Sequence, residues 1–101
     1  MRMLMQVTLS NAAFNDAIKD GTVGQKTERI LEETRPEAVY FTEFDGHRTV
    51  IMIVNVEDPS KVPGLAEPWF LLFDADVRFH IVMSQEELGR AGLDAFAEKW
   101  S

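Results

Sequence analysis

Cysteine is absent from the chain, and this absence excludes several kinds of chemistry at once. Without cysteine there is no disulfide framework, no thiolate ligand for a metal and no thiol nucleophile. Basic residues are also few: ten Lys and Arg stand against 17 Asp and Glu, which gives a net charge of −7. Because a field of that sign repels nucleic acids and anionic membranes, and no basic cluster offsets it locally, we expect neither as a partner.

Long apolar runs and the common catalytic motifs are missing as well. No stretch approaches the roughly 20 apolar residues of a membrane span, and the apolar start of the chain is too short for a signal peptide. There is no Gly-rich phosphate loop, nucleophile elbow or zinc-protease helix. The two histidines, His47 and His80, lie far apart with no ligand spacing around either. We therefore expect no metal and no cofactor, and a cytoplasmic location is the default.

What is present is enough apolar sequence for one modest core. The chain has 101 residues, 46% of them hydrophobic, which predicts a single domain over residues 1–101. Its strongest local signal is Asp45-Gly46 between two runs of β-branched and aromatic residues, the pair that a type I′ hairpin turn favours. Residues 38–56 are therefore predicted to form a long β-hairpin. The turn fixes a register in which Glu43 lies opposite Arg48 as a charge pair.

The segments around the hairpin predict a mixed α+β fold. Two further strands are indicated by alternation at Met3–Leu9 and Val77–Met83. A helical segment is predicted from Ser10 or Asn11 to Pro36, with a break near its two glycines. Short helical turns are predicted from Asp58-Pro59, because Pro63 and Pro68 limit their length. A last helix is predicted after the capping box Ser84-Gln85-Glu86-Glu87. This order fits a split βαβ arrangement, in which an antiparallel four-stranded sheet carries its helices on one face and a C-terminal helix follows.

Strand alternation sorts the sheet into a face toward the helices and an open face. The helix-facing positions are Met3, Met5, Val7, Val39, Phe41, Val50, Met52, Val54, Val77, Phe79, Ile81 and Met83. The open face carries Leu4, Gln6, Thr8, Tyr40, Thr42, Thr49, Ile51, Ile53, Arg78, His80 and Val82. A lone chain would leave these apolar residues in water, and such patches usually mark an interface. We therefore expect a homodimer in which a second copy covers the open face.

The chain resembles the ferredoxin-like dimeric α/β-barrel superfamily. The stretches that resemble an uncharacterised bacterial family within it are residues 35–43 (RPEAVYFTE), 58–60 (DPS) and 65–70 (LAEPWF). The resemblance implies a ferredoxin-like βαββαβ fold and dimerisation. The superfamily includes heme-dependent enzymes, cofactor-free monooxygenases, isomerases and ligand-binding regulatory domains, so it implies no particular activity.

Five polar residues of the open face are the candidate ligand-binding residues: Gln6, Tyr40, Thr42, Arg78 and His80. Arg78 would hold an anionic group and His80 would hydrogen-bond it or, as the candidate catalytic residue, carry a proton. The competing interpretation is that these groups make a polar seam in the dimer interface. Two functions stay open: a non-catalytic or ligand-sensing dimer, and a small cofactor-free enzyme, of monooxygenase or isomerase type, acting on an apolar anionic metabolite.

His47, Trp69, Phe70 and Phe73 have structural interpretations. His47 flanks the hairpin turn, where a histidine is usually exposed. The three aromatic residues are spaced for a helical face and are expected in the core rather than around a cofactor.

Overall fold

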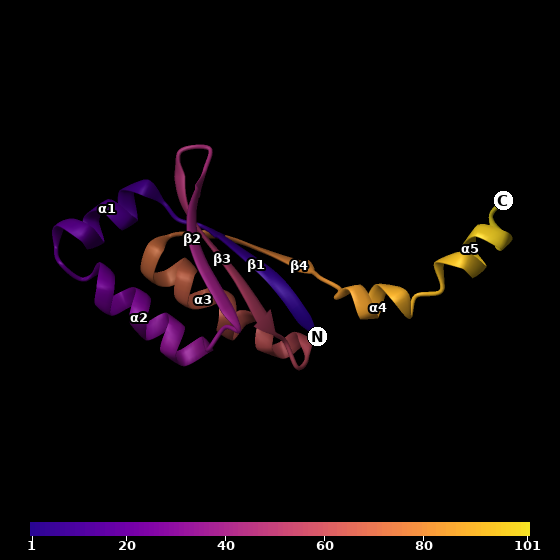
Figure 1. Ribbon diagram of the computed structural model, residues 1–101. Coiled ribbons are helices and arrows are strands. Elements are labelled where there is room, and N and C mark those ends of the chain that lie inside the picture. Colours follow the sequence, from indigo (N-terminus) through magenta and orange to yellow (C-terminus); the bar gives the residue numbers. More distant parts are fainter.

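Four strands form one antiparallel sheet in the computed structural model, which describes residues 1–101 (Figure 1). The strands are β1 (Arg2–Thr8), β2 (Ala38–Phe44), β3 (His47–Asn55) and β4 (Asp76–Ile81). The helices are α1 (Asn11–Lys19), α2 (Val23–Thr34), the short 3₁₀ helix η1 (Pro59–Lys61), α3 (Val62–Phe73), α4 (Gln85–Gly89) and α5 (Leu93–Lys99). The α+β class predicted from the sequence is confirmed.

The strands lie side by side in the order β2-β3-β1-β4, with β1 and β3 in the centre. Every neighbouring pair is antiparallel. The core forms between α1, α2, α3 and the face of the sheet that they cover. This arrangement is compatible with the ferredoxin-like fold, and it leaves the other face of the sheet without any helix of the same chain (Figure 1).

The hairpin forms with the predicted turn and register. Asp45 and Gly46 have φ angles of 53° and 81°, as a type I′ turn requires, and Glu43 lies opposite Arg48. The two side chains do not form the predicted ion pair. The Glu43 carboxylate accepts a hydrogen bond from the Gly46 amide instead, while the Arg48 guanidinium donates to Asn15 Oδ1 at 2.9 Å.

The helical stretch after β1 divides into two pieces, as its glycines predict. The Ser10 side chain caps α1 by accepting a hydrogen bond from the Ala13 amide. The chain then turns at Asp20-Gly21-Thr22, where Gly21 has a φ of 81°. Asp20 stabilises this turn because its carboxylate accepts from both the amide and the hydroxyl of Thr22. The second piece, α2, ends at Thr34 just before Pro36.

Helix α3 is longer than the sequence predicts, so the expectation that prolines limit it to short turns is wrong. Pro63 lies in the first turn, where a missing N–H costs nothing. Pro68 lies inside the helix and lacks the N–H that would bond the Gly64 carbonyl. Its cost of about 3 kcal/mol is comparable to what burying one large side chain contributes, and α3 buries both Trp69 and Phe73 completely.

The core follows the predicted helix-facing set, with corrections at its edges. Twelve residues form the buried cluster, listed here with its largest members first: Trp69, Phe73, Met5, Ile30, Met52, Val7, Val50, Val54, Leu9, Val56, Ala75 and Ala17. Four residues predicted to be covered are at least 40% exposed, namely Phe41, Phe70, Ile81 and Met83. Met83 lies beyond the end of β4, which is shorter than the predicted strand. Phe41 and Ile81 lie on the edge strands β2 and β4, and Phe70 points away from the core side of α3, where Trp69 and Phe73 lie.

The predicted C-terminal helix is instead two short helices that leave the body of the molecule. The capping box forms as expected, because the Ser84 hydroxyl accepts from the Glu87 amide and the Glu87 carboxylate accepts from the Ser84 amide. The helix then ends at Gly89, and Gly92, with a φ of 76°, separates α4 from α5. The segment extends away from the sheet in Figure 1.

Candidate functional site

The open face of the sheet holds all five residues predicted to bind a ligand. Strand pairing places four positions in one row across the sheet: Arg78 on β4, Gln6 on β1, Ile51 on β3 and Tyr40 on β2. We call these four residues the central row. Because neighbouring strands lie about 4.8 Å apart, the row is about 14 Å long between the Cα atoms at its ends.

Two parallel rows flank the central row. On one side lie His80, Leu4, Ile53 and Ala38; on the other lie Asp76, Thr8, Thr49 and Thr42. Arg78 and His80 are two residues apart on β4, so their Cα atoms are separated by about 7 Å. One small group can therefore contact Gln6, Arg78 and His80 together, whereas Tyr40 and Thr42 lie at the far edge of the face.

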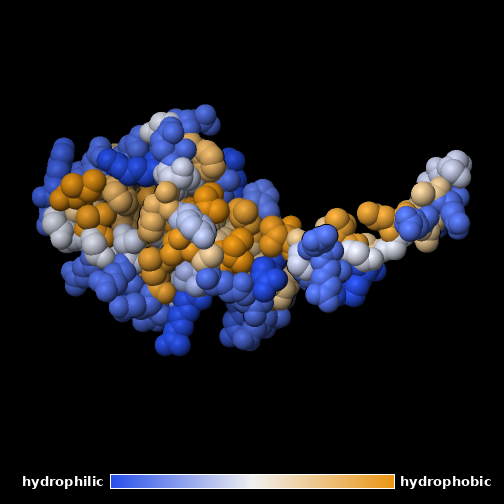
Figure 2. All heavy atoms as spheres, viewed as in Figure 1, coloured by the Kyte–Doolittle hydropathy of each residue, from blue (hydrophilic) through white to orange (hydrophobic).

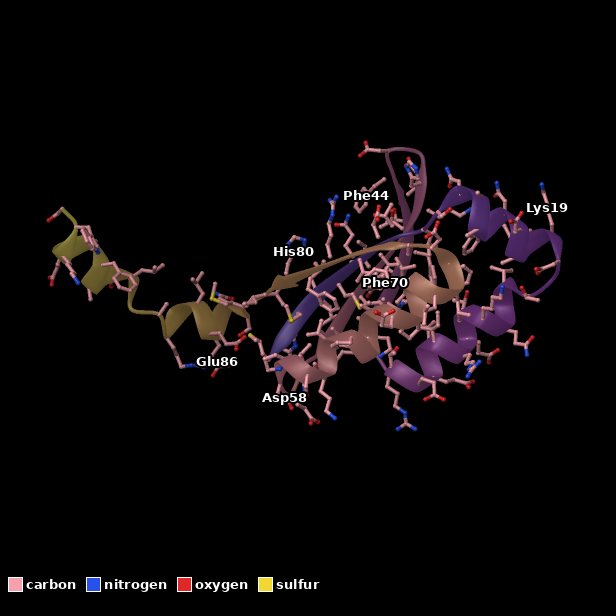
Figure 3. The ribbon with its side chains drawn as sticks, turned by 180° about the vertical axis from the view of Figure 1, so that it is seen from behind. Lys19, Phe44, Asp58, Phe70, His80 and Glu86 are labelled. Carbon is pink, nitrogen blue, oxygen red and sulfur yellow. The ribbon has the colours of Figure 1, made fainter.

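The candidate ligand-binding residues of this face are largely exposed, and Arg78 and His80 are unpaired in the single chain. Arg78, His80, Tyr40 and Thr42 are all exposed, and Gln6 is half-buried. Neither Arg78 nor His80 makes a side-chain hydrogen bond or ion pair; the chain's two ion pairs are Arg2–Glu37 and Glu86–Arg90. Figure 3 shows His80 pointing away from the side of the sheet where α3 lies.

Thr49 is the exception on the open face, because it is buried to 1% exposure. It lies between Thr8 and Thr42 in its row, and its hydroxyl donates to the His47 carbonyl at 3.1 Å. Phe44, which sequence reasoning did not include, belongs to the same face by alternation with Thr42. It is 48% exposed and adds a second aromatic ring near the hairpin turn. The alternation that selected Tyr40 and Thr42 was the signal that could have found it.

The open face borders one small hollow, near the hairpin, where Thr42 and Thr49 lie together with Leu9, Phe14 and Phe41; this hollow does not include Gln6, Tyr40, Arg78 or His80. Another hollow lies between α2 and α3, around Arg29, Glu33, Glu67 and Leu71, and others lie between α1, α2 and Phe41 and along the C-terminal helices. A flat, uncovered face gives a ligand one wall and no enclosure. An enclosed site here needs a second surface over the sheet.

The carboxyl groups with shifted pKa values lie outside this face: Asp20 stabilises the turn between α1 and α2, and Asp58 and Glu87 take part in helix caps. Hydrogen bonds from Thr22, Ser60 and Ser84 hold the pKa values of Asp20, Asp58 and Glu87 below their ordinary values. Asp58 opens η1, where it accepts from the Ser60 amide at 2.9 Å. These shifts therefore indicate local structure rather than acid–base chemistry.

The acidic residues and histidines of the chain do not gather into a metal-binding cluster. No three His, Cys, Asp or Glu side chains come close enough together to hold a metal ion. His47 is exposed beside the turn, where Nδ1 lies 3.2 Å from the Asp45 carbonyl oxygen. No helix reaches the length and hydropathy that crossing a bilayer requires.

Comparison with known proteins gives no relative: no protein-family model matches the sequence, and no curated protein resembles it at a significant level. The resemblance to the dimeric α/β-barrel superfamily therefore stays a prediction. Function has to be argued from the open face itself.

Proposed function

We propose that the protein is a homodimeric, non-catalytic domain that binds or senses a small amphipathic anion on the open face of its sheet. The observation that carries this proposal is the central row. It offers a cation at one end in Arg78, an amide beside it in Gln6, an apolar surface in Ile51 and an aromatic ring in Tyr40. A few polar groups aimed from an apolar surface are the usual composition of a ligand site.

The length of the row defines the ligand class. The carboxylate of the ligand pairs with the Arg78 guanidinium, which presents a planar fork of donors matched to that group. Its apolar body then lies over Ile51 toward Tyr40, across about 14 Å of sheet. A short acid such as acetate reaches only the cationic end and leaves the apolar part of the row uncovered. The expected ligand is therefore a carboxylic acid with an extended apolar body.

The dimer is part of the proposal because the open face alone encloses nothing. Tyr40 is 69% exposed, and Leu4, Ile51, Ile53 and Val82 are only half-buried. A second copy packed on this face, as in a dimeric α/β barrel, would cover these residues and give the ligand a second wall. The cytoplasmic location expected from the sequence belongs to the same proposal.

The enzymatic alternative has less support from the geometry. A general acid or base is normally oriented by a hydrogen bond to a neighbouring group. His80 has no such partner among the residues of its own chain, and its neighbour across the strand is Leu4. We therefore favour ligand binding over proton transfer as the role of His80.

Three probes of matched size or charge test the proposal. Octanoate has the anionic group and the apolar body, octylamine has the body with the opposite charge, and acetate has the charge without the body. We expect octanoate alone to raise the melting temperature and to give a binding isotherm by calorimetry. Arg78→Ala should weaken octanoate at least about tenfold, because a charge-assisted hydrogen bond is lost.

Arg29→Ala is the matched control, because Arg29 is an exposed arginine on α2 beside a hollow far from the open face. It should leave octanoate binding unchanged. Equal binding of octanoate and octylamine, or equal loss in both variants, would contradict the proposed site. If Arg78→Ala splits the dimer while octanoate never binds, the open face is an interface and not a ligand site.

A further inference from the structure

The last 19 residues form a segment that makes almost no contact with the rest of its own chain. We call residues 83–101 the C-terminal arm. Every residue in it is exposed, and all hydrogen bonds and ion pairs of residues 84–101 are internal to that segment. Figures 1 and 2 show the arm extending from the end of β4 as a thin projection with apolar atoms along it.

The dimensions of the molecule show how far the arm departs from a compact fold. The radius of gyration is 17.1 Å, whereas a compact chain of this length has about 13 Å. The longest axis measures 60 Å against 29 and 19 Å for the other two. Val82 still pairs with β1 through a bond from its amide to the Arg2 carbonyl, and Ser84 is extended, so the chain continues outward from the sheet rather than folding back.

The helices of the arm are too short to be stable in water without a partner surface. They have five and seven residues, well below the roughly 12–15 that an isolated helix needs. Leu93 and Phe96 on α5 and Trp100, the residue that caps its C-terminus, are spaced three and four residues apart, the spacing of one helical face. These three side chains are between 52% and 77% exposed. An apolar face of this kind needs a surface to cover it, and the chain itself supplies none.

We propose that the arm packs on the open sheet face of a second copy of this chain, with the two arms exchanged around a two-fold axis. This inference rests on the homodimer of the proposed function and names the part of the second copy that completes it. The open face is the receiving surface because no helix of the same chain covers it and it carries apolar side chains, with Tyr40, Leu4 and Ile53 among its residues.

Charge complementarity supports this receiving surface. Asp94 and Glu98 lie four residues apart on α5, beside the apolar face, and neither has a basic partner in the chain. Arg78 on the open face has no acidic ion-pair partner. Asp94 and Glu98 of one copy would attract Arg78 of the other, whose nearest ionisable neighbours on the open face are Asp76 and His80, whereas two chains of net charge −7 repel in general.

The size of the arm is sufficient for a stable interface. A standard protein–protein interface takes roughly 20–30 residues from each partner. The arm supplies nearly that number by itself, and a two-fold exchange uses the arm and the receiving face of both copies. Exchange of identical segments between protomers is a low-cost route to a dimer.

Tryptophan quenching in the full-length chain reports directly on the arm. Trp69 is 1% exposed in the core, whereas Trp100 is 77% exposed on the arm. If the arm packs on a second copy, Trp100 becomes protected from iodide as protein concentration rises through the dimer range, and its emission shifts to shorter wavelength. Trp100→Phe removes this change and identifies its source. A Trp100 that stays fully quenchable in a proven dimer overturns the inference.

A pair of substitutions that keeps Trp100 as the reporter tests the apolar face. Leu93→Ser combined with Phe96→Ser should weaken the dimer at least about tenfold by sedimentation. At concentrations where the protein is monomeric, the body should keep its melting temperature, since neither side chain touches it. Ile18→Ser is the control, because Ile18 is 48% exposed on α1 and its replacement lowers surface hydrophobicity away from the arm. Equal effects in the two variants would overturn the inference.

Charge reversal separates the specific contact from general repulsion. Asp94→Lys with Glu98→Lys changes the net charge from −7 to −3, because each replacement adds two units. General electrostatics then predicts a tighter dimer. The proposed contact predicts a weaker one, with recovery when Arg78→Glu is added in the same chain. A tighter dimer, or no recovery, contradicts the arm contact.

The arm experiments and the ligand experiments give distinguishable outcomes, although the arm and the ligand would both contact Arg78. If the dimer survives Leu93→Ser with Phe96→Ser and Trp100 stays exposed, the arm is not part of the interface. The ligand proposal is then tested separately by octanoate binding to Arg78→Ala. An arm that is protected in a dimer without octanoate binding supports the exchange and removes the ligand. A chain that is monomeric at all concentrations contradicts both.

Discussion

At the scale of single residues, the turn of the hairpin restricts which amino acids its positions accept. Gly46 has a φ of 81°, a region that β-branched residues strongly disfavour, while a Cβ added there would meet no other atom. Gly46→Val should therefore lower the free energy of unfolding by about 1 kcal/mol or more, through backbone strain alone. Urea unfolding followed by circular dichroism measures this change.

Gly24→Ala is the matched control for that substitution. Gly24 also has open space around its Cα, but it lies inside α2 with an ordinary helical conformation. Alanine at this position should stabilise the protein by about 0.5–1 kcal/mol because it has the higher helix propensity. If both variants destabilise the protein equally, the positive φ is not the cause.

The sequence predicts the position of a residue correctly where backbone geometry alone determines it. The register of the hairpin follows from Asp45-Gly46, because a two-residue turn fixes which residues oppose each other. The partner of Arg48 could not be predicted in the same way. Its guanidinium lies 4.8 Å from the centre of the Phe14 ring and donates to Asn15, and both partners depend on where α1 packs.

At the scale of helices and strands, the cap of η1 predicts a pH dependence of stability. The hydroxyl and amide of Ser60 donate to the Asp58 carboxylate and lower its pKa below 3.8 in the folded state. A lowered pKa means that this carboxylate stabilises the fold above the unfolded-state value and that the contribution is lost as pH falls through the folded-state value. Stability should therefore decrease on acidification below about pH 4.

Asp58→Asn and Asp58→Ala separate the charge from the cap. Asparagine keeps a side-chain acceptor but does not titrate, so the acid decrease in the urea midpoint should become shallower while the midpoint at pH 7 changes little. Alanine removes the acceptor and should lower the midpoint at pH 7. An unchanged acid slope in Asp58→Asn would show that this cap does not contribute.

The sequence predicts the break between α1 and α2 correctly, but it does not predict that α3 continues through Pro68 or that the last helix divides in two. The glycine pair after α1 gives the expected break, and Asp20 stabilises it locally. The proline rule fails at Pro68 because tertiary burial of Trp69 and Phe73 outweighs a local cost. The division of the last helix at Gly92 follows from weak propensity with no packing to offset it, since nothing in the chain covers α4 or α5.

At the scale of the whole molecule, Tyr40→Arg tests the homodimer without threatening the fold. Tyr40 is 69% exposed in the single chain, so a long cationic side chain is tolerated there by the monomer. In a dimer that covers the open face it would bury an unpaired charge, and the dissociation constant should rise at least about tenfold. Light scattering at micromolar concentration measures the state.

Leu71→Arg provides the comparison, because Leu71 is 79% exposed on α3, on the opposite side of the sheet. It should leave the dimer unchanged. A monomeric parent protein, or dissociation by both substitutions, would contradict an interface at the open face.

The sequence places the candidate site on a face but cannot complete it. Alternation along the strands is enough to bring Gln6, Tyr40 and Arg78 to one side, because side chains of a strand point to alternate faces. The distance between Tyr40 and Arg78 needed the strand order. Whether Tyr40 and Arg78 are enclosed depends on a second chain that covers the sheet. The alternation of residues within one chain carries no information about that second chain.

The strand order also has a consequence for the time course of folding. The hairpin of β2 and β3 joins neighbouring segments and can form as soon as both are available. Strand β1 enters the sheet between β3 and β4, so its partners come from the middle and the far end of the strand-forming region. During synthesis β1 emerges first and yet must wait for β4 before its second edge is paired. An apolar strand is therefore kept incomplete until nearly the whole sheet has left the ribosome.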